Sequence, residues 1–582
     1  MKKNLSYRIY LLIIAGIALL LLNDCKENLS SLKNSNPGTV NKEYALVIPL
    51  CSNDYTTLSR TIVPDDVPSA SPKLKPSDMA LFSIYGYGKW HYGPGLPSQL
   101  RLDLMADGYS SPSVKKSTKL LRFFAMTDIH LTDKESPAQA IFFAPVAGNN
   151  GTSCYSPVML YTTHVLNAAV QTINDIHKQS PFDFGIALGD MANSTQYNEL
   201  RWFIDILDGK KINPDSGKKD DPIPGPNNDY QDTYQAEGLN KSIPWYAALG
   251  NHDHFWMGSK VVTDHLRKVL VGKNILQTGN IFTDKNALNE STYSLGVLDG
   301  STPFGNIIGS GVVANMTKIP TITEDPNRRP LSTKEFMSEF SSSTTLPRGH
   351  GFIQPYSSNK FGACYSFEPK SNLPLKIIVL DDTEDESDVP GPSLIYGYGS
   401  LANGRLEWLI KQLKAGQAED KLMVIAAHVP IGTATGTPMG WYNNDDETAT
   451  IQKLKEFPNL ILWISGHRHL NTVTAFKSDI PNHPEYGFWE VETKSLREFP
   501  QQFRTFDIVR NSDNTISIIT TNVDPEVKPG SFAAISRSYA IASIQTYGVP
   551  DPLLPTGSPS YNAELVKQLS REMQLKIKNL KY

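Results

Sequence analysis

The chain has 582 residues, of which 40% are hydrophobic, 20% are charged and 10% are aromatic. This composition is that of a globular protein and excludes disorder along most of the chain. The length predicts one large domain with appendages, or two domains. The 55 basic and 59 acidic residues give a formal net charge of -4. No overall charge therefore favours binding to nucleic acid or to an anionic membrane, and we predict no nucleic-acid-binding surface.

Residues 1–25 have the layout of a signal peptide. A basic N-terminus precedes the apolar run Ile9–Leu22, which is shorter than the ~20 residues that span a bilayer. Cys25 follows in the stretch LLNDC, which resembles the acylation site of a bacterial lipoprotein, although polar residues stand where small ones are expected. We predict an exported protein, periplasmic or at the cell surface, with Cys25 as a candidate site of lipid attachment to the membrane. The alternative is an uncleaved N-terminal anchor helix.

The remaining cysteines argue against a disulfide framework. If Cys25 is modified, only Cys51, Cys154 and Cys364 are left, which allows at most one bridge. The sequence contains no CxxC pair, so it excludes a zinc site built from such pairs of thiolates.

Residues 26–118 are rich in Pro, Gly, Ser and Tyr, as in the stretch YGYGKWHYGPGLP at 85–97. They show no sustained period of 2 or 3.6 residues, which regular strands and helices require. We predict an irregular N-terminal arm that lies on the main domain.

Short apolar runs then alternate with longer amphipathic segments. The runs are Leu120–Met126, Phe184–Leu188, Pro244–Leu249, Lys376–Asp381, Leu422–Ala427 and Leu460–Ser465. Their shortness and continuous apolarity predict strands buried on both faces. Helices are predicted at Val158–Lys178, at Thr195–Leu207 and after Asn403, which is a candidate N-cap. Strands that alternate with helices indicate an α/β fold.

Two long insertions interrupt this alternation, at 208–242 and 255–374. Both are dominated by polar residues, Gly and Pro and have few periodic stretches. Loops of this length in a compact domain usually carry function or are disordered. We expect them to form a rim over the functional site.

Residues 511–582 are predicted to pack on the main domain as a hairpin strand followed by a helix. The stretches RTFDIV and TISIITT are joined by Asn511–Asn514, which is a hairpin signal. Asn562 is a candidate cap of the last helix, in which apolar residues recur every four positions at Leu565, Leu569, Met573 and Ile577.

Five of the predicted strands end in residue types that bind metal ions. The endings are, in chain order, MTDIH with Asp128 and His130, LGDMAN with Asp190, LGNHDHF with Asn251 and His252, AAHVP with His428, and SGHRHL with His467 and His469. In an extended backbone, residues two apart point the same way, so Asp128 and His130 are expected to reach one ion. A single Asp or His after a strand is usually a cap or a packed side chain. Five such endings in succession predict a metal site.

The series DxH, GD, GNHD, H and GHxH resembles the calcineurin-like metallophosphoesterases, a superfamily that includes the purple acid phosphatases. The resemblance covers about residues 119–510. It implies an α/β fold built as a four-layer αββα sandwich, in which two mixed β-sheets are flanked by helices, here with long loop insertions. It also implies two metal ions held at the strand ends.

The resemblance assigns a role to each ligand. The first metal ion would be held by Asp128, His130 and His469, the second by Asn251, His428 and His467, and both by a bridging Asp190. These ligand types suit divalent ions or a di- and trivalent pair of Mn, Fe or Zn, and the sequence does not choose among them. Two ions about 3.5 to 4 Å apart clamp a phosphoryl oxygen and lower the pKa of a shared water, so that a metal-bridging hydroxide exists near neutral pH.

Residues beside these ligands are candidates for contact with substrate. His252 occupies the family's position for transition-state stabilisation or for protonation of the leaving group. Asp253 either orients the His252 imidazole as a catalytic residue or closes the turn. Asn193 stands where a tyrosine binds ferric iron in the purple acid phosphatases, which disfavours a tyrosinate-bound enzyme. Asn193, His254 and His350 are weaker candidates for substrate binding.

Other polar residues are assigned structural roles. Arg468 is predicted to point away from the metal ions and to form an ion pair. Asp381 and Asp382 are predicted to cap or close a turn, and His164 to be exposed on a helix. The stretch FPQQFR, at 499–504, is predicted only to pack.

Together these features predict an exported, metal-dependent hydrolase of phosphomonoesters or phosphodiesters. Candidate substrates are small-molecule phosphoesters, such as nucleotides and glycerophosphodiesters, and lipid headgroups, and the sequence does not distinguish among them. The alternative is a non-catalytic, surface-anchored binding protein that keeps the metallophosphoesterase fold. The intact ligand set argues against this alternative.

Overall fold

The computed structural model describes residues 55–110, 114–144, 154–217, 231–284, 286–299, 304–352, 361–388, 395–432, 440–441, 444–547, 560–578 and 580. They belong to one compact unit, Leu46–Tyr582. The predicted signal peptide, Cys25 and Cys51 lie outside the described residues. Among the described helices, none is long and apolar enough to cross a membrane. Cys154 and Cys364 are both buried and unbridged.

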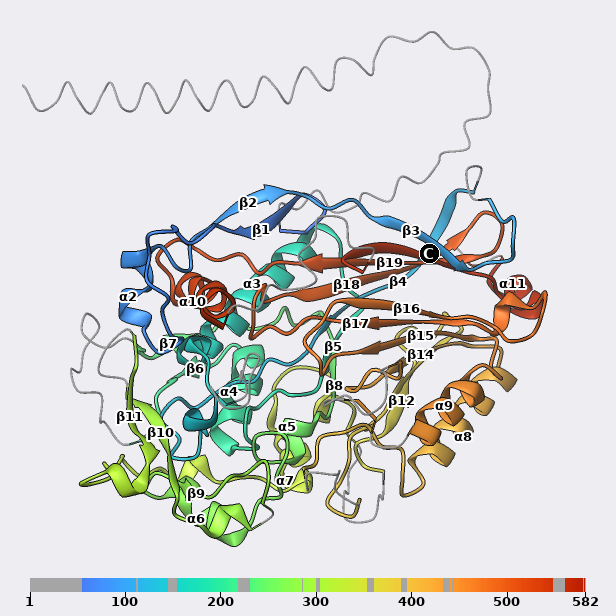
Figure 1. The fold of residues 1–582 in the computed structure, drawn as a ribbon. Coiled ribbons are helices and arrows are strands. Elements are labelled where there is room, and N and C mark those ends of the chain that lie inside the picture. Colours follow the sequence, from blue (N-terminus) through green and yellow to red (C-terminus); the bar gives the residue numbers. More distant parts are fainter. Residues whose placement is uncertain are drawn as a thin grey trace, which may run out of the picture. The chain divides into compact units, whose positions relative to one another are not determined.

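A seven-stranded sheet contains the first three predicted strands (Figure 1). Its order is β3-β20-β19-β18-β4-β5-β8. The strands are β3 (Gln99–Leu104), β4 (Lys116–Met126), β5 (Phe184–Leu188), β8 (Trp245–Ala248), β18 (Phe503–Asn511), β19 (Ile516–Val523) and β20 (Asn562–Lys567). β4, β5 and β8 are parallel neighbours, so their carboxyl ends lie at one edge of the sheet. The predicted hairpin of β18 and β19 is confirmed.

A six-stranded sheet contains the other three predicted strands. Its order is β12-β13-β14-β15-β17-β16. The strands are β12 (Tyr365–Phe367), β13 (Leu375–Val379), β14 (Leu422–Ala426), β15 (Leu460–Ser465), β16 (Thr472–Phe476) and β17 (Phe488–Glu492). β13, β14, β15 and β17 are successive parallel neighbours, whereas β12 and β16 pair antiparallel at the two edges. Both large sheets are therefore mixed.

The alternation of side chains along β14 shows how the layers pack. Leu422, Val424 and Ala426 belong to the main core, which also holds residues of the seven-stranded sheet and of the helices α3 (Thr162–Gln179) and α4 (Tyr197–Asp208). Met423 and Ile425 face the opposite way and pack with residues of α8 (Arg405–Ala418). The predicted α/β sandwich of two mixed sheets and helices is confirmed.

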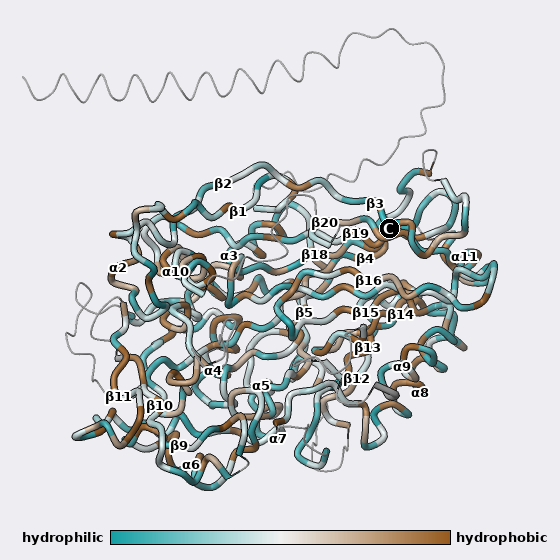
Figure 2. The backbone as a smooth tube through the Cα atoms, in the orientation of Figure 1, coloured by the Kyte–Doolittle hydropathy of each residue, from teal (hydrophilic) through white to brown (hydrophobic). Residues whose placement is uncertain are grey.

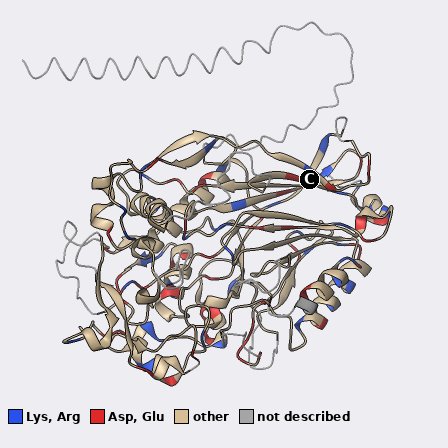
Figure 3. Cartoon of the chain, viewed as in Figure 1, with Lys and Arg blue, Asp and Glu red and all other residues tan. Residues whose placement is uncertain are grey.

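Hydropathy and charge follow this layering. In Figure 2 the tube is brown along β14 and β15 and changes between brown and teal along α8 and α9 (Asn444–Leu454). A helix with one apolar face and one solvated face has this pattern. Figure 3 shows both blue and red segments on α8 and α9, while the strands beside them carry few charges.

The N-terminal arm is more regular than predicted. It contains β1 (Arg60–Pro64), α2 (Met79–Tyr85) and β2 (Trp90–Pro94), and β1 pairs antiparallel with β2. β3 pairs in parallel with β20 and so belongs to the seven-stranded sheet. The prediction of an irregular arm is wrong for these segments, because their backbone groups find partners that are distant in sequence.

The insertions also contain regular structure. The described part of 208–242 includes the paired short strands β6 (Lys211–Ile212) and β7 (Tyr234–Gln235). The insertion at 255–374 contains α6 (Asp264–Val271), the antiparallel strands β9 (Gln277–Thr278), β10 (Tyr293–Asp299) and β11 (Asn306–Val312), and α7 (Thr333–Glu339). The prediction of long loops is therefore wrong for much of this segment. Its apolar residues, such as Trp256 and Leu295, build a second core.

Two predicted helix starts in the C-terminal half are corrected, and one helix there was not predicted. Asn562 opens the strand β20 rather than a helix, and its side-chain oxygen accepts hydrogen bonds from Thr57 and Asn522. The last helix, α11 (Arg571–Ile577), begins later and is capped by Ser570. α10 (Phe532–Tyr547) was not predicted from the sequence. The N-cap of α8 is Gly404, at φ 89°, and not Asn403.

Candidate metal centre

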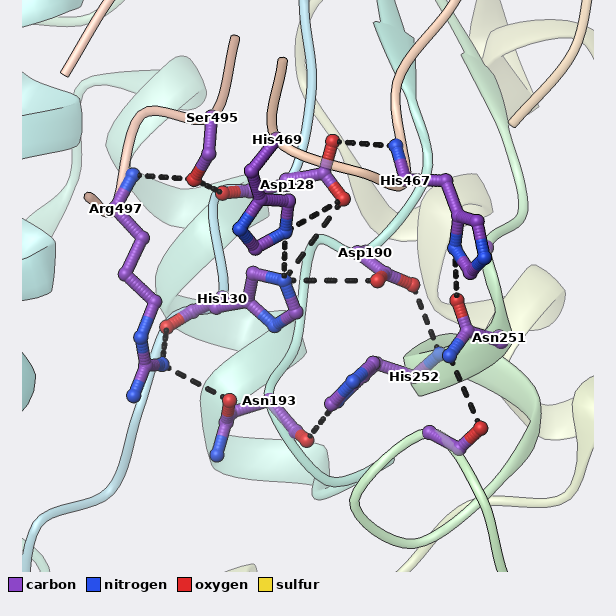
Figure 4. Close-up of polar contacts among 12 residues, drawn as sticks. Asp128, His130, Asp190, Asn193, Asn251, His252, His467, His469, Ser495 and Arg497 are labelled. Carbon is purple, nitrogen blue, oxygen red and sulfur yellow. Dashed lines mark hydrogen bonds and ion pairs between the residues drawn. The ribbon is translucent and has the colours of Figure 1, made fainter. Parts of the chain in front are cut away.

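Seven of the predicted site residues follow the carboxyl ends of β4, β5, β8, β14 and β15 and lie close together. The residue that follows β8 opens the short helix α5 (Asn251–His254). Figure 4 shows Asp190 between His130 on one side and Asn251 on the other. We name the seven residues the strand-end cluster: Asp128, His130, Asp190, Asn251, His428, His467 and His469.

The first half-site contains Asp128, His130 and His469. His469 Nε2 lies 3.1 Å from Asp128 Oδ1 and 3.2 Å from His130 Nε2. The second carboxylate oxygen of Asp128, Oδ2, accepts hydrogen bonds from the Thr127 hydroxyl at 2.7 Å and from the His467 backbone N–H at 2.9 Å. These bonds fix the carboxylate so that Oδ1 faces the two imidazoles.

The second half-site contains Asn251, His428 and His467. Asn251 Oδ1 lies 3.0 Å from His428 Nε2 and 3.1 Å from His467 Nδ1, and these two nitrogens are 3.2 Å apart. The Asn251 amide donates to Gly258 O at 3.0 Å, which turns Oδ1 toward the imidazoles. His428 Nδ1 donates to the Leu188 carbonyl at 2.7 Å, which turns Nε2 toward the site.

Asp190 lies between the two half-sites. Its Oδ2 is 3.5 Å from His130 Nε2 and 3.4 Å from His428 Nε2. Its Oδ1 accepts a hydrogen bond from the His252 backbone N–H at 2.8 Å. One carboxylate oxygen therefore faces both half-sites, where the sequence-based prediction puts a bridging ligand.

The backbone at these turns is strained. Five cluster residues have positive φ: Asp128 (51°), His130 (45°), Asp190 (53°), His467 (74°) and His469 (55°). Residues other than glycine rarely adopt this conformation, and such outliers concentrate at functional sites. The expectation of an extended backbone at Asp128 and His130 is therefore wrong. The two side chains converge because the chain turns.

Glycines next to the cluster allow the turns to approach each other. A Cβ on Gly250 would lie 2.3 Å from Asp190 Oδ1, and one on Gly466 would lie 2.0 Å from Thr127 Oγ1. A Cβ on Gly189, at φ 96°, would lie 2.6 Å from His428 Nδ1. Any side chain at these three positions would displace a cluster residue or its hydrogen-bond partner.

The donor atoms of the cluster fit cations. Imidazole nitrogens face each other at 3.2 Å in both half-sites, and the oxygens opposite them are acceptors as well. Within the described part of the chain, Asp128 Oδ1 is buried and accepts no hydrogen bond. Buried lone pairs that converge repel one another unless a cation or proton lies between them. The described residues form three groups that could hold a metal ion, made of Asp128, His130 and His469, of His130, Asp190 and His252, and of Asp190, His428 and His467.

The pKa values of the imidazoles differ within each half-site. Burial lowers the pKa of His130 and of His467 well below the ordinary value, so both are neutral. Burial also opposes the charge of His428, but Asp190 raises its pKa to about 10. His469 is buried as well, and Glu498 and Asp128 raise its pKa to about 10. In each half-site one imidazole holds a proton that a cation would displace.

His252 is held by backbone contacts beside the cluster. Its Nδ1 donates to the Asn193 carbonyl at 2.6 Å, and a ring nitrogen lies within 4.8 Å of ligand atoms of His130 and Asp190. Burial lowers the pKa of His252, which keeps the imidazole neutral. Asp253 does not orient this ring. Its carboxylate accepts hydrogen bonds from the backbone N–H groups of Asp190, Met191, Ala192 and Gly250, so the turn-closing alternative is correct.

Two of the weaker candidates for substrate binding, Asn193 and His254, are in contact with other side chains. The Asn193 side chain accepts from Arg497 at 2.9 Å and donates to Gln139 at 3.2 Å. His254 lies 3.2 Å from Asp381 and 3.1 Å from Thr333 of α7, which brings the 255–374 insertion against α5.

His350 lies away from the strand-end cluster. It is fully buried and stacks on Trp245 at a ring separation of 3.5 Å. Trp245 opens β8, whereas Asn251 follows its end, so these contacts give no support to the predicted substrate contact of His350.

Among the residues assigned structural roles, the predictions for Arg468 and Asp382 are confirmed and that for His164 is wrong. Arg468 forms an ion pair with Glu492 at 2.6 Å. Asp382 accepts hydrogen bonds from the backbone N–H groups of His428 and Val429. His164 was predicted to be exposed, but its ring stacks against Tyr234 and burial lowers its pKa to about 4.

The segment after β17 supplies site residues that the sequence analysis missed. Glu498 Oε2 lies 2.6 Å from His469 Nδ1, and Ser495 Oγ donates to the Asp128 carbonyl at 2.7 Å. Arg497 donates to the His130 carbonyl at 3.2 Å and to Asn193 Oδ1 at 2.9 Å (Figure 4). β17 is a parallel neighbour of β15, so its carboxyl end lies at the same edge. The alternating stretch FWEVE was the signal that could have shown this strand.

Comparison with known proteins leaves the family open. No protein-family model matches the chain, and no curated protein matches its sequence. Among solved structures, the chain is similar to the crystal structure of a dimetal phosphatase from Danio rerio, with 11% sequence identity and a TM-score of 0.33. The similarity covers 70% of this chain and 100% of that chain. A TM-score this low supports no functional assignment, so function has to be argued from the side chains of the strand-end cluster.

Proposed function

We propose that the protein is a metal-dependent phosphoester hydrolase whose strand-end cluster holds two cations. The observation that carries this proposal is the pair of half-sites in which imidazole nitrogens face each other at 3.2 Å with Asp190 Oδ2 between them. Asp128, His130 and His469 would hold one cation, and Asn251, His428 and His467 the other, with Asp190 shared. When bound, the cations would supply Lewis acidity, which polarises a phosphoryl oxygen and lowers the pKa of a water molecule.

His252 is proposed to act on the leaving group. The Asn193 carbonyl holds its Nδ1, which fixes the ring beside His130 and Asp190. An anionic phosphoryl group placed next to this buried, neutral imidazole raises its pKa, because an adjacent negative charge favours the protonated form. His252 then gains a proton as substrate binds and donates it to the departing alkoxide.

The immediate surroundings of the cluster support this division of roles. The Asn193 side chain is engaged by Arg497 and Gln139, and the Asp253 carboxylate by four backbone N–H groups. Among the described cluster neighbours, His252 is therefore the residue proposed to contact the substrate. Asn193 and Asp253 act through the positions of His252 and Asp190.

Phosphodiesters and phosphomonoesters, including lipid headgroups, are the proposed substrates, and Mn, Fe and Zn are the proposed cations because oxygen and imidazole ligands accept all three. Export and membrane attachment through Cys25 are proposed from the sequence of residues 1–25. Cell fractionation of the wild type and of Cys25→Ser tests them. Release of the variant from the membrane fraction is expected, and retention of the variant contradicts lipid attachment.

A reconstitution assay tests the function. The protein is stripped with a chelator, reloaded with Mn, Fe or Zn, analysed for bound metal and assayed on p-nitrophenyl phosphate and bis-p-nitrophenyl phosphate. Two bound ions and cleavage of at least one ester are expected, and the ratio of the two rates reports the ester class. Metal binding without cleavage under every metal would favour the non-catalytic binding protein instead. Absence of metal binding would contradict the proposed site itself.

A further inference from the structure

The two half-sites differ in their negative charge. The first contains the Asp128 carboxylate, whereas the ligands of the second, Asn251, His428 and His467, are an amide and two imidazoles. Asp190 is shared and does not distinguish the half-sites. The difference in negative charge is larger when the partners of the imidazole Nδ1 atoms are included. His428 Nδ1 contacts the neutral Leu188 carbonyl, whereas His469 Nδ1 contacts the Glu498 carboxylate.

The Glu498 carboxylate is directed at His469. Glu498 Oε2 lies 2.6 Å from His469 Nδ1, while the other carboxylate oxygen, Oε1, lies 3.8 Å from Arg497 Nε. The Arg497 guanidinium donates through Nη1 to the His130 carbonyl, to Thr132 and to Asn193. The close partner of Glu498 is therefore His469, and the contact turns Nε2 of His469 toward Asp128 Oδ1 and His130 Nε2.

Other buried carboxylates around the cluster are engaged elsewhere. Asp253 accepts hydrogen bonds from backbone N–H groups of the turns after β5 and β8. Asp382 accepts from the backbone N–H groups of His428 and Val429 and does not approach the His428 ring in the contacts described. Glu492 pairs with Arg468 at 2.6 Å. Among these carboxylates, only Glu498 contacts an imidazole of the strand-end cluster.

We infer that Glu498 is a positioning residue for the half-site of Asp128, His130 and His469, and that it makes this half-site bind a divalent cation more tightly than the half-site of Asn251, His428 and His467. The inference rests on the proposed function. A carboxylate behind a ligating imidazole fixes its tautomer and orientation and increases its basicity. Glu498 also adds a negative charge beside the half-site that already contains Asp128. In a poorly solvated environment, each added negative charge increases the attraction for a cation.

A Mn²⁺ titration of the full chain, stripped with a chelator, tests this inference without an activity assay. The wild type is expected to show a tight and a weak class of sites. Asn251→Ala should abolish the weak class and keep the tight one. Glu498→Gln should weaken the tight class by about 10- to 100-fold and leave the weak class unchanged. Glu526→Gln is the matched control, because Glu526 contacts Arg60 at the same 2.6 Å distance outside the site, and it should change neither class.

The outcomes separate this inference from the proposed function. Wild-type protein that binds no Mn²⁺ would contradict both. The inference would be overturned, and the proposed function would stand, if the wild type bound Mn²⁺ at two sites of equal affinity. The same holds if the Mn²⁺ affinity of the tight class were unchanged in Glu498→Gln. If Glu498→Gln does not fold, Glu498→Asp takes its place, because the shortened side chain keeps the charge but withdraws from His469. If the tight class of Mn²⁺ sites in Glu498→Asp had the same affinity as in the wild type, the contact between Glu498 and His469 would not be what positions the imidazole.

Discussion

Among the described residues, two of the buried clusters that contain charged side chains have contacts that differ in kind. The first is the strand-end cluster. The second, which we name the Asp133–Arg328 cluster, consists of Asp133, Lys134, Asp215, Ser216 and Arg328. Here Arg328 Nε donates to Asp133 Oδ2 at 3.1 Å, Ser216 donates to Asp133 Oδ1 at 2.6 Å, and Lys134 donates to Asp215. Each of these donors meets an acceptor, whereas in each half-site of the strand-end cluster two imidazole nitrogens face each other at 3.2 Å.

The difference distinguishes a structural cluster from a ligand site. A buried charge is costly unless it is paired and hydrogen-bonded. The Asp133–Arg328 cluster contains its own cations, since the guanidinium and ammonium groups come from the chain. The seven side chains of the strand-end cluster are carboxylates, imidazoles and an amide, with no Lys or Arg among them, and its proposed cations would come from outside the chain. Burial and charge alone therefore do not identify a ligand site. The kind of group that faces each buried carboxylate distinguishes the two clusters.

The largest expected effect is at Asp190. Asp190→Asn removes the charge shared by both half-sites while keeping the shape of the side chain. We expect hydrolysis of p-nitrophenyl esters to fall by about 10³-fold, because electrostatic stabilisation in a buried site is lost. Metal analysis should show fewer bound ions per chain. Asp208→Asn, at a buried carboxylate held by Ser343 and Thr344, is the control and should retain its ions. Wild-type turnover in Asp190→Asn would contradict the strand-end site.

The next effect is at Arg328, in the structural cluster. Arg328→Met leaves the Asp133 carboxylate without its buried cation, which should lower the free energy of unfolding by about 3–5 kcal/mol. The number of ions bound per folded chain should stay at the wild-type value. Chemical denaturation and metal analysis of the same samples check both statements. A variant that keeps its stability but loses its ions would reverse the roles assigned to the two clusters.

A smaller effect concerns acid stability and involves neither cluster. Burial lowers the pKa of His350 to about 4, from an ordinary value of 6.5. The unfolded chain then binds this proton before the folded one does, so stability is present above pH ~6.5 and is lost as the pH falls toward 4. The loss amounts to about 3 kcal/mol. His350→Phe should flatten this dependence in urea titrations done with excess chelator, and a slope equal to that of the wild type would contradict the assignment.

The smallest expected effect is at Gly258. A Cβ at this position, which has φ 67°, would lie 2.3 Å from His252 Cδ2 and 2.4 Å from Asn251 Nδ2. Gly258→Ala should therefore displace the His252 ring and reduce kcat by ~10-fold, the scale of changes in groups that orient a site. The tight class of Mn²⁺ sites should persist, since the atoms nearest to this Cβ belong to His252 and Asn251 and not to Asp128, His130 or His469. An unchanged kcat would show that the ring position of His252 is not critical.

Local sequence was informative where a strand leads directly into a ligand. The runs before Asp128, Asp190, Asn251 and His428 are apolar enough to specify buried strands. β4, β5 and β8 are parallel neighbours, which brings Asp128, Asp190 and Asn251 to one edge of their sheet, whereas His428 follows β14 of the six-stranded sheet. The types of residue at the strand ends then limit the chemistry to oxygen and imidazole ligands. For this part of the site, short segments contain nearly all the necessary information, because the ligands directly follow the strands that position them.

Tertiary structure decided the features that depend on partners distant in the chain. Glu498 follows a strand with weaker apolar character and meets His469 only because β17 pairs with β15. In the Asp133–Arg328 cluster, Asp133 and Arg328 are 195 positions apart in the sequence. Residues 562–567 form the strand β20 because β19 and β3 offer backbone partners on its two sides. His350 carries a ligand's side chain, yet stacking on Trp245 makes it part of the core. Residue type determined which chemistry is available, and long-range packing determined which of these groups face one another.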